Sequence, residues 1–450
     1  MTLGEENKVL RKALRQYLKG YLFSTKNYSD SFTQEIISRL EDWVLPTIVY
    51  DFYRTKSKNF SSFLEIFSLD AIFDKYPLLK KRVLLFLDQS FKEYQSVSKF
   101  SHDDNFKILG DIHPDSVTKY SDKRFVYYKN FPNYFPLIVE LSATIFPELK
   151  NYFPNIELLE GWYKRTYVKV NKDGDEENVK QYYYNFGYIL PLLLLLRTTD
   201  SNQENVLIDM PYPKFFDFEC IFLGDVGDFE YTIGSSGIVK VEEEDRSSLT
   251  GGKGKVKSLL KPMIYGNEAE PKIKWVVQSK GRFDNIPRIF GKEVNPRDYM
   301  LHIERGWQEG AKKVLNNLDD IISIVDNIDI SFRIILKATK VYRYLTLKSL
   351  YPQEYLKDPK LNKLVQELDN YPDILDVKHC GSRRYEMESM KKCQIPVFYS
   401  KLRKNDIYSP KGDIVAEHKR TPYDIWREYV SGYNERFLDM QLIILKESLV

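Results

Sequence analysis

The chain has 450 residues, of which 43% are hydrophobic and 29% charged, a composition typical of a folded protein of one large domain or two to three ordinary ones. Its 67 basic and 64 acidic residues leave a net charge of +3, which argues against a nucleic-acid-binding protein. Three scattered cysteines, Cys220, Cys380 and Cys393, exclude a disulfide framework and favour a reducing, cytoplasmic location.

The sequence predicts no membrane span. The N-terminus has neither the apolar core nor the cleavage site of a signal peptide. The most apolar run, Phe186 to Leu196, contains Gly187 and Pro191 and has about half of the roughly 20 residues that a spanning helix needs. We therefore expect this run to be part of a buried core.

Helices are predicted first, then strands, then helices again. An apolar stripe from Leu10 to Leu22 indicates a helix, and a break is expected at Asp74 to Pro77. Strands are expected at Phe106–Gly110, Arg124–Tyr128, Tyr163–Val168 and Lys214–Phe218, and a buried helix at Val179–Leu196. Glycines and charges predict a long, partly mobile excursion over residues 226–300. The clearest later helices are predicted at Leu301–Ile324 and Ile328–Ser349.

Two short motifs suggest chemistry but are better explained as ordinary surface. The glycines and lysines from Gly251 to Lys255 do not have the spacing of a phosphate-binding loop, so a solvated loop is favoured. His379 and Cys380 resemble a fragment of a metal site. With five histidines and three cysteines in the chain, however, a four-ligand zinc site is not expected.

A stronger signal comes from the order of five charged and polar residues. Lys129 ends a predicted strand, and Asp200 and Asn205 follow the buried helix with the spacing D-x-x-x-x-N. Asp217 and Glu219 then lie on the next hydrophobic strand. This order is that of kinase-type phosphoryl transfer, in which a cation grips ATP phosphates, a carboxylate orients the attacking hydroxyl and oxygen ligands hold Mg²⁺.

The same residues belong to a longer series of motifs that resembles the dehydratase domain of the LanM-type class II lanthipeptide synthetases. The matching segments are Tyr76–Leu78, Gly110–His113, Val126–Lys129, Gly161–Trp162, Tyr183–Gly187, Thr199–Asn205, Tyr212–Glu219, Phe332–Tyr342, Ile395–Phe398 and Asp439–Gln441. They extend over almost the whole chain.

The resemblance implies an α+β, bilobal fold like that of the lipid kinases, with an added helical region specific to dehydratases. The expected parts are a helical region over residues 1–104, a kinase-like N-lobe over 105–198, and a C-lobe over 199–450 with an activation-type loop and C-terminal helices.

Residue roles carried over by the resemblance fall into two groups. For phosphoryl transfer, Lys129 would bind ATP phosphates, Asp200 would position or deprotonate the substrate hydroxyl, Asn205 and Asp217 would ligate Mg²⁺, and Asn202 and Glu219 would support the nucleotide site. For elimination of the phosphate, the implied residues are Asp111, His113, Arg333 and Thr339. Arg333 and Thr339 lie six apart on a strand-to-helix or helical segment.

The implied activity is that of a stand-alone, cytoplasmic peptide dehydratase. It would phosphorylate Ser and Thr of a ribosomal precursor peptide, bound through its leader, with ATP and Mg²⁺. Loss of phosphate would then give dehydroalanine or dehydrobutyrine. Because no cyclase-type zinc ligands are seen, a separate cyclase or reductase is an expected partner.

Three departures from the family pattern leave two alternatives open. Asn202 replaces a histidine, Asn130 and Phe131 replace Pro-Arg, and Lys337 replaces an arginine. One alternative is a peptide or protein Ser/Thr kinase that stops at the phosphorylated product. The other is a catalytically degenerate scaffold that binds the precursor. Arg333 with Thr339 argues against the first, and the retained charged set argues against the second.

Overall fold

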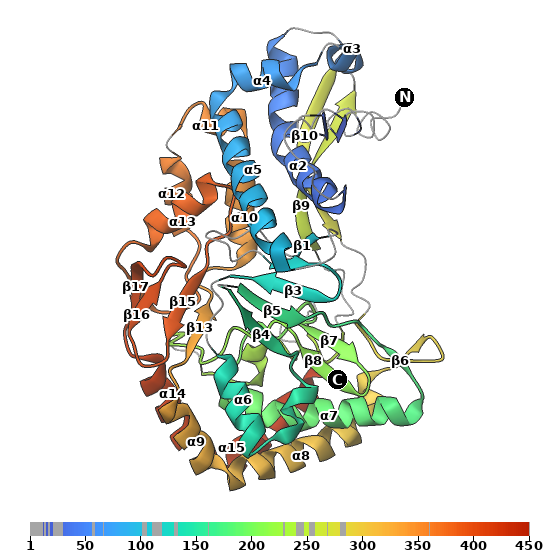
Figure 1. Cartoon of the computed structure of the whole chain (residues 1–450), viewed down its shortest axis with the longest axis vertical. Helices are drawn as coiled ribbons and strands as arrows, with labels where there is room; N and C mark the ends of the chain where they lie inside the picture. The colour runs from blue at the N-terminus through green and yellow to red at the C-terminus, as the bar shows by residue number, and fades with distance from the viewer. Residues whose placement is uncertain are drawn as a thin grey trace.

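The computed structural model is an α+β protein with several small, mainly antiparallel sheets (Figure 1). It describes residues 12, 15–16, 19–20, 30–55, 59–65, 67–100, 106–109, 119–129, 134–160, 162–227, 230–239, 247–251, 257–267, 269–279, 285–359 and 361–449. The predicted α+β class is confirmed.

The N-terminal part is helical, as the sequence predicts. Its helices are α2 (Asp30–Arg54), α3 (Phe60–Glu65), α4 (Leu69–Lys75), α5 (Pro77–Val97) and the 3-10 helix η1 (Ser98–Phe100). α4 ends at the predicted break because Tyr76 precedes Pro77, and Pro77 opens α5, where no amide donor is required. Most of the stripe predicted from Leu10 to Leu22 lies outside the described residues.

A five-stranded antiparallel sheet follows, in the order β1-β2-β3-β5-β4. Its strands are β1 (Lys107–Leu109), β2 (Lys119–Ser121), β3 (Phe125–Tyr128), β4 (Ile156–Leu159) and β5 (Trp162–Thr166), with α6 (Phe135–Thr144) and η2 (Pro147–Asn151) inserted between β3 and β4. Three of these strands were predicted from the alternation of side chains. One face of the sheet meets α5, where the Trp162 indole donates to Ser96 Oγ at 3.2 Å.

The apolar helix predicted at Val179–Leu196 is α7 (Glu176–Leu195), which is buried along most of its length. Asp175 caps it by accepting from the Asn178 amide at 2.8 Å. Its close partner is α8 (Met300–Asn316), and glycines make the contact. A Cβ on Gly306 would stand 2.0 Å from the Tyr184 carbonyl oxygen, so only glycine permits this backbone separation.

The region between these helices differs from its prediction. The short strand expected at Lys214–Phe218 is β8 (Tyr212–Phe215), which pairs with β7 (Val206–Asp209). Residues 226–300, expected as a long loose excursion, contain a long hairpin of β9 (Lys257–Asn267) and β10 (Glu270–Ser279). This hairpin lies beside α2 (Figure 1), so its partner is a helix more than two hundred residues earlier. Smaller elements here are η3 (Ile233–Ser236), β11 (Arg288–Ile289), β12 (Lys292–Glu293) and η4 (Pro296–Tyr299). β11 pairs with β6 (Asp173–Gly174), which precedes α7.

The C-terminal part contains a second five-stranded sheet, in the order β13-β15-β16-β17-β14. Its strands are β13 (Ser331–Ile334), β14 (Val377–His379), β15 (Phe398–Lys401), β16 (Asp406–Tyr408) and β17 (Ile414–His418). The helices are α9 (Leu318–Asn327), α10 (Thr339–Lys348), α11 (Pro352–Tyr355), α12 (Asn362–Asp369), α13 (Ser382–Lys391), α14 (Pro422–Ser431) and α15 (Glu435–Ser448).

The helix predicted over Ile328–Ser349 is wrong in its first part. Phe332 and Ile334 are buried and alternate with less buried residues, which is the period of a strand, and this segment pairs with β15. Helix begins only at Thr339.

A buried arginine helps to hold the N-terminal helices against the C-terminal part. The Arg82 guanidinium of α5 donates to the carbonyl oxygens of Ser349, Met390 and Lys391 at 2.8–2.9 Å. These carbonyls lie at the ends of α10 and α13, where helix geometry leaves acceptors without partners.

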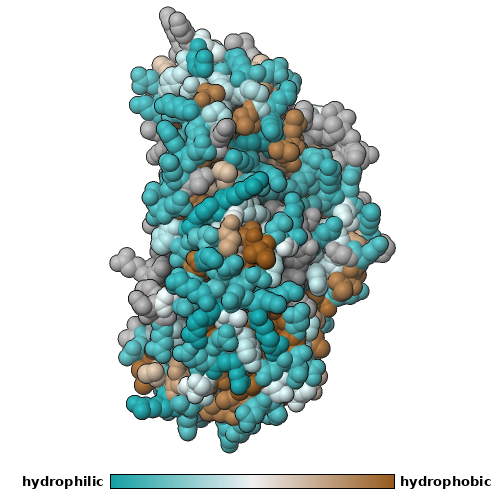
Figure 2. All heavy atoms as spheres, turned by 90° about the vertical axis from the view of Figure 1, so that its left-hand side faces the viewer, coloured by the Kyte–Doolittle hydropathy of each residue, from teal (hydrophilic) through white to brown (hydrophobic). Residues whose placement is uncertain are grey.

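The face shown in Figure 2 is mainly hydrophilic, and hydrophobic side chains form small separate groups on it. Among the described helices, none is long and apolar enough to cross a membrane.

Candidate active site

Asp200 lies in a tight loop directly after α7. Its φ of 59° is in the left-handed region, which few residue types other than glycine and Asn or Asp adopt readily. Backbone bonds on either side hold this conformation, from Thr199 N to the Cys220 carbonyl at 2.9 Å and from Ser201 N to the Ser236 carbonyl at 2.8 Å. The loop therefore fixes the direction of the Asp200 side chain before any ligand binds.

Two asparagines that follow Asp200 are bonded to it. The Asn202 amide donates to Asp200 Oδ1 at 2.8 Å, and the Asn205 amide donates to the Asp200 carbonyl at 2.6 Å. With its nitrogen committed in this way, Asn205 presents its side-chain oxygen as the remaining ligand atom. Asn202 thus positions the carboxylate by a neutral hydrogen bond.

Asp217 and Asn205 are neighbours across the β7–β8 hairpin. The Asn205 carbonyl accepts from the amides of Phe216 at 3.2 Å and Asp217 at 3.5 Å. The chain then continues to Glu219, whose carbonyl accepts from Arg333 N of β13 at 2.8 Å. The segment after β8 thereby connects the Asp200 loop to the second sheet.

Cations from both five-stranded sheets meet these carboxylates. Lys119 Nζ of β2 lies 2.6 Å from Asp217 Oδ1 and 3.5 Å from Glu219 Oε1. Arg333 of β13 pairs with the same Glu219 oxygen at 2.5 Å. Buried Arg165 of β5 stacks over the Phe216 ring at 5.2 Å and adds positive charge near Asp217. We call Asp200, Asn202, Asn205, Asp217, Glu219, Lys119, Arg165 and Arg333 the acidic–basic cluster.

The two aspartates of the cluster have opposite electrostatic environments. Burial raises the pKa of Asp200 to about 6, and Asp217 and Glu219 add to the increase, which Arg333 partly offsets. Burial by itself would also raise the pKa of Asp217, but Lys119 and Arg165 outweigh it and lower the pKa to about 2. Near neutral pH, Asp217 is therefore a fixed negative charge, whereas Asp200 can exchange a proton.

Six of the ten residues that the sequence analysis assigned to the site come together here. They are Asp200, Asn202, Asn205, Asp217, Glu219 and Arg333. Asp111 and His113 lie outside the described residues. Thr339 is the first residue of α10, and no contact between described residues ties it to the cluster.

Lys129, expected at the ATP phosphates, lies on the other face of the first sheet. Its Nζ is 4.9 Å from the centre of the Trp162 ring, the residue that bonds to α5. When the β2–β3 register is continued by one position, Lys119 lies opposite Tyr128, so these two side chains share a face of the sheet. Lys129 follows Tyr128 directly and points to the opposite face, because successive side chains of a strand alternate between faces. In this structure Lys119, and not Lys129, is the strand lysine that contacts the acidic groups of the cluster.

Lys119 and Arg165 were missed by the sequence analysis. The signal that relates them is the alternation of side chains between the two faces of the sheet. Arg165 pairs with Val126, Val126 pairs with Ser121, and Ser121 is two residues from Lys119. Cross-strand partners share a face, so Lys119 and Arg165 point to the same side. Which side chains share a face can be predicted only after the register of the strands is known.

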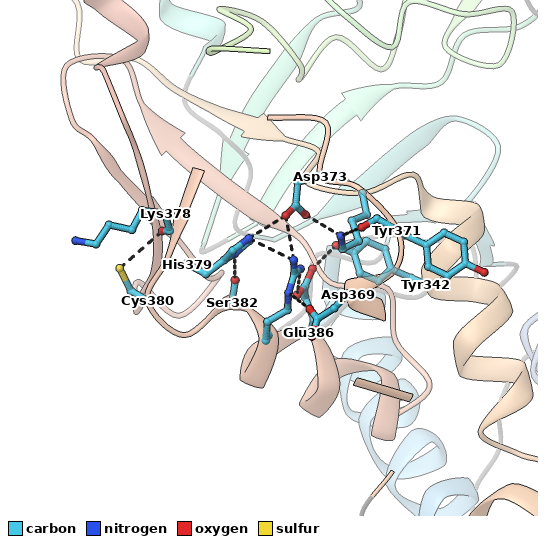
Figure 3. A network of polar contacts seen from close by, with 11 residues as sticks. Tyr342, Asp369, Tyr371, Asp373, Lys378, His379, Cys380, Ser382 and Glu386 are labelled. Carbon is cyan, nitrogen blue, oxygen red and sulfur yellow. Dashed lines mark hydrogen bonds and ion pairs between the residues drawn. The ribbon is translucent and has the colours of Figure 1, made fainter. Parts of the chain in front are cut away.

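Lys337, which takes the place of the second arginine of the family element, points away from the cluster. It is buried, lies 3.0 Å from Asp373 Oδ1 and donates to the Tyr371 carbonyl. Asp373 also binds Arg383 at 3.0 Å and His379 at 2.8 Å (Figure 3).

The His379 side of this network is structural. Its second ring nitrogen contacts Ser382 Oγ at 2.5 Å, and Ser382 is fully buried at the start of α13. Arg383 also pairs with Glu386, whose carboxylate accepts from the Tyr342 hydroxyl at 2.6 Å. The network joins α10, β14 and α13, and it accounts for both Lys337 and His379.

An α+β fold with a charged site between two antiparallel sheets is the class that these observations define. Residues 160–401, more than half of the chain, match the family described as "Domain of unknown function (DUF4135)", and the chain belongs to that family. Almost the whole acidic–basic cluster lies within the matched residues, Lys119 being the exception.

One curated protein is similar over most of the chain. It is the "Lacticin 481/lactococcin biosynthesis protein LcnDR2" of Lactococcus lactis subsp. lactis, 22% identical over 404 residues. The match covers 81% of this chain and 41% of that protein, so the chain spans less than half of the relative's length. The chain is thus distantly related to a protein of lanthipeptide biosynthesis.

Proposed function

We propose that this protein is a lanthipeptide-type dehydratase, which phosphorylates Ser or Thr of a ribosomal precursor peptide with ATP and then eliminates the phosphate. The observation that carries the proposal is the pair Asp200 and Asp217, held close together with opposed pKa shifts beside Lys119 and Arg333. The distant relation to a lacticin 481 and lactococcin biosynthesis protein supports the choice of substrate.

Phosphoryl transfer requires a group that accepts the hydroxyl proton and positive charge that faces the phosphates. Asp200 is suited to the first task, because a pKa of about 6 leaves it mostly ionised near neutral pH yet still able to take up a proton. Lys119 is suited to the second, because it already lies 2.6 Å from Asp217 at the centre of the cluster.

Mg²⁺ fits the oxygen atoms available beside these groups. Asn205 offers its side-chain oxygen and Asp217 an ionised carboxylate, and backbone bonds hold the two residues together. No set of three or more His, Cys, Asp or Glu residues in the described part of the chain forms a metal site alone. Mg²⁺ is commonly held by one or two protein oxygens with phosphates and water, and it would neutralise the charge of the bound triphosphate.

In this proposal the parts of the fold divide the work as they do in a kinase. The first sheet supplies Lys119 and Arg165 from above the cluster, and the loops after α7 and β8 supply the acceptor and metal-binding groups. Asp200 would accept the proton of the peptide hydroxyl as that oxygen attacks the γ-phosphorus of ATP and ADP leaves.

The second reaction, elimination of the phosphate, would take place at the same cluster. A base removes the proton from Cα, the electrons form the Cα–Cβ double bond, and phosphate leaves from Cβ with the former hydroxyl oxygen. Phosphate leaves readily when a cation stabilises its charge. Arg333 provides a planar guanidinium for this purpose, and its bond to Glu219 keeps it at the cluster.

Intact-mass spectrometry of a candidate precursor peptide, incubated with the protein and Mg-ATP, tests the proposal. Dehydration removes about 18 Da for each residue, whereas a kinase would leave about 80 Da more and a scaffold would leave the mass unchanged. Asp217→Asn is the matched negative control, because no later step can start without the phosphoryl group.

A further inference from the structure

A depression lined by lysines lies on the first sheet. Its volume is about 310 Å³, and its lining includes Lys107, Lys123 and Lys169, with Tyr167 and Ser121 between them. We call it the three-lysine depression. The lysines come from β1, from the turn after β2 and from the segment after β5, so the fold brings them together from three places.

The three lysines are exposed and have no acidic partner within the described part of the chain. Elsewhere on the same sheet a lysine does have one, since Lys164 pairs with Glu157 at 3.0 Å. Like charges around one depression repel each other and concentrate the positive potential there. An anionic ligand would remove this repulsion.

The depression lies on the same face of the sheet as the acidic–basic cluster. Lys107 pairs with Ser121 and Leu109 pairs with Lys119, so these side chains share the face from which Lys119 reaches Asp217. Ser121 and Lys119 are two positions apart on β2, a backbone distance of about 7 Å. The depression and the cluster therefore lie at neighbouring positions on the same face of the sheet.

We propose that the three-lysine depression binds an acidic segment of the peptide substrate, a few residues away from the Ser or Thr that reacts at Asp200. The peptide nature of the ligand rests on the proposed function. Glutamate or aspartate side chains of the peptide would pair with Lys107, Lys123 and Lys169. The half-exposed ring of Tyr167 would pack against the aliphatic parts of these lysines. The site would thus select acidic sequences around the modified residue.

Binding can be measured by fluorescence anisotropy with a short labelled peptide that contains several glutamates and one serine. The triple variant K107A/K123A/K169A should bind it about tenfold more weakly at low salt, because each exposed charge pair contributes modestly. The difference should shrink at high salt. The matched control K401A/K404A/K411A removes the same charge from exposed positions around the β15–β16 and β16–β17 turns and should bind as the parent does.

Two further measurements identify the ligand. A peptide with glutamine in place of glutamate should bind the parent and the K107A/K123A/K169A variant equally weakly, and a fluorescent ATP analogue should bind both equally well. The inference is overturned if both triple variants weaken peptide binding alike, if the glutamine peptide binds the parent as well as the acidic one, or if only ATP binding is lost.

The chemistry is assayed separately, so the two proposals can fail independently. With Mg-ATP, the K107A/K123A/K169A variant should modify the acidic peptide with a raised KM and the parent kcat. A parent that binds the acidic peptide through these lysines but never changes its mass would refute the dehydratase proposal and leave the binding site intact.

Discussion

The choice between Lys119 and Lys129 as the phosphate-binding cation gives the sharpest prediction. Lys119→Ala removes a charge that lies 2.6 Å from Asp217, in a position where only 13% of the lysine side chain is exposed. Two unit charges about 3 Å apart attract by roughly 5 kcal/mol at an effective dielectric constant of about 20, which is an upper bound because desolvation opposes it. Deletion of a preorganised charge contact typically costs about 10²–10³-fold in rate.

Lys129→Ala is the matched variant, since it removes the same charge from the adjacent strand. Its contact with the Trp162 ring at 4.9 Å contributes on the order of 0.5–1 kcal/mol to stability and nothing to the cluster. We therefore expect phosphorylation within about threefold of the parent, because a stability loss of this size leaves the protein folded and the cluster unchanged.

The assay is the initial rate of peptide phosphorylation and dehydration by intact mass, at saturating peptide and varied Mg-ATP. Lys119→Ala should lower the rate about 10²–10³-fold and Lys119→Arg should restore part of it. A loss that is larger for Lys129→Ala than for Lys119→Ala would refute the assignment made from the sheet register.

Three other predictions concern the cluster and the core. Because Asp200 must be ionised to accept a proton, kcat/KM for phosphorylation should rise about tenfold per pH unit below its pKa of about 6 and level off above it; a profile flat from pH 5 to pH 7 would exclude Asp200 as the base. Arg333→Ala should slow elimination by about 10²–10³-fold more than phosphorylation, so that stable phosphopeptide accumulates; dehydration at the parent rate would exclude Arg333 as the cation for the leaving phosphate. Gly306→Ala places a Cβ against a helix backbone 2.0 Å away and should lower the free energy of unfolding in urea by about 1–3 kcal/mol, whereas Gly381→Ala, with open space around its Cβ, should change it little; equal effects would contradict the packing argument.

The sequence by itself determined the local elements whose signal lies in a short window. α7 follows from a long apolar run behind the Asp175 cap, and β1, β3 and β5 follow from alternating side chains between turns. The spacing from Asp200 to Asn205 likewise predicted neighbours, because a tight loop brings residues five apart into contact.

The tertiary structure decided which distant groups meet. Lys119 and Lys129 lie on different strands and point to opposite faces of the sheet. A shift of the register by one residue would move every side chain of a strand to the other face. β13 is too short and too polar to be distinguished from a helix by its own residues, and pairing with β15 is what makes it a strand. The β9–β10 hairpin follows the same rule, because its turn-rich flanks predict a loop and its partner α2 lies far away in the chain.

The fate of Lys337 has the same physical origin. Its position in the sequence beside Arg333 suggested one shared site, yet Arg333 is on the strand and Lys337 follows the strand's end, where the chain turns toward α10. A buried ammonium needs a charged partner, and Asp373 supplies it at 3.0 Å. Composition and motif spacing thus determined which charged residues the protein contains, whereas sheet register and helix packing determined which of them share a site, because contacts between segments far apart in sequence depend on the path of the whole chain.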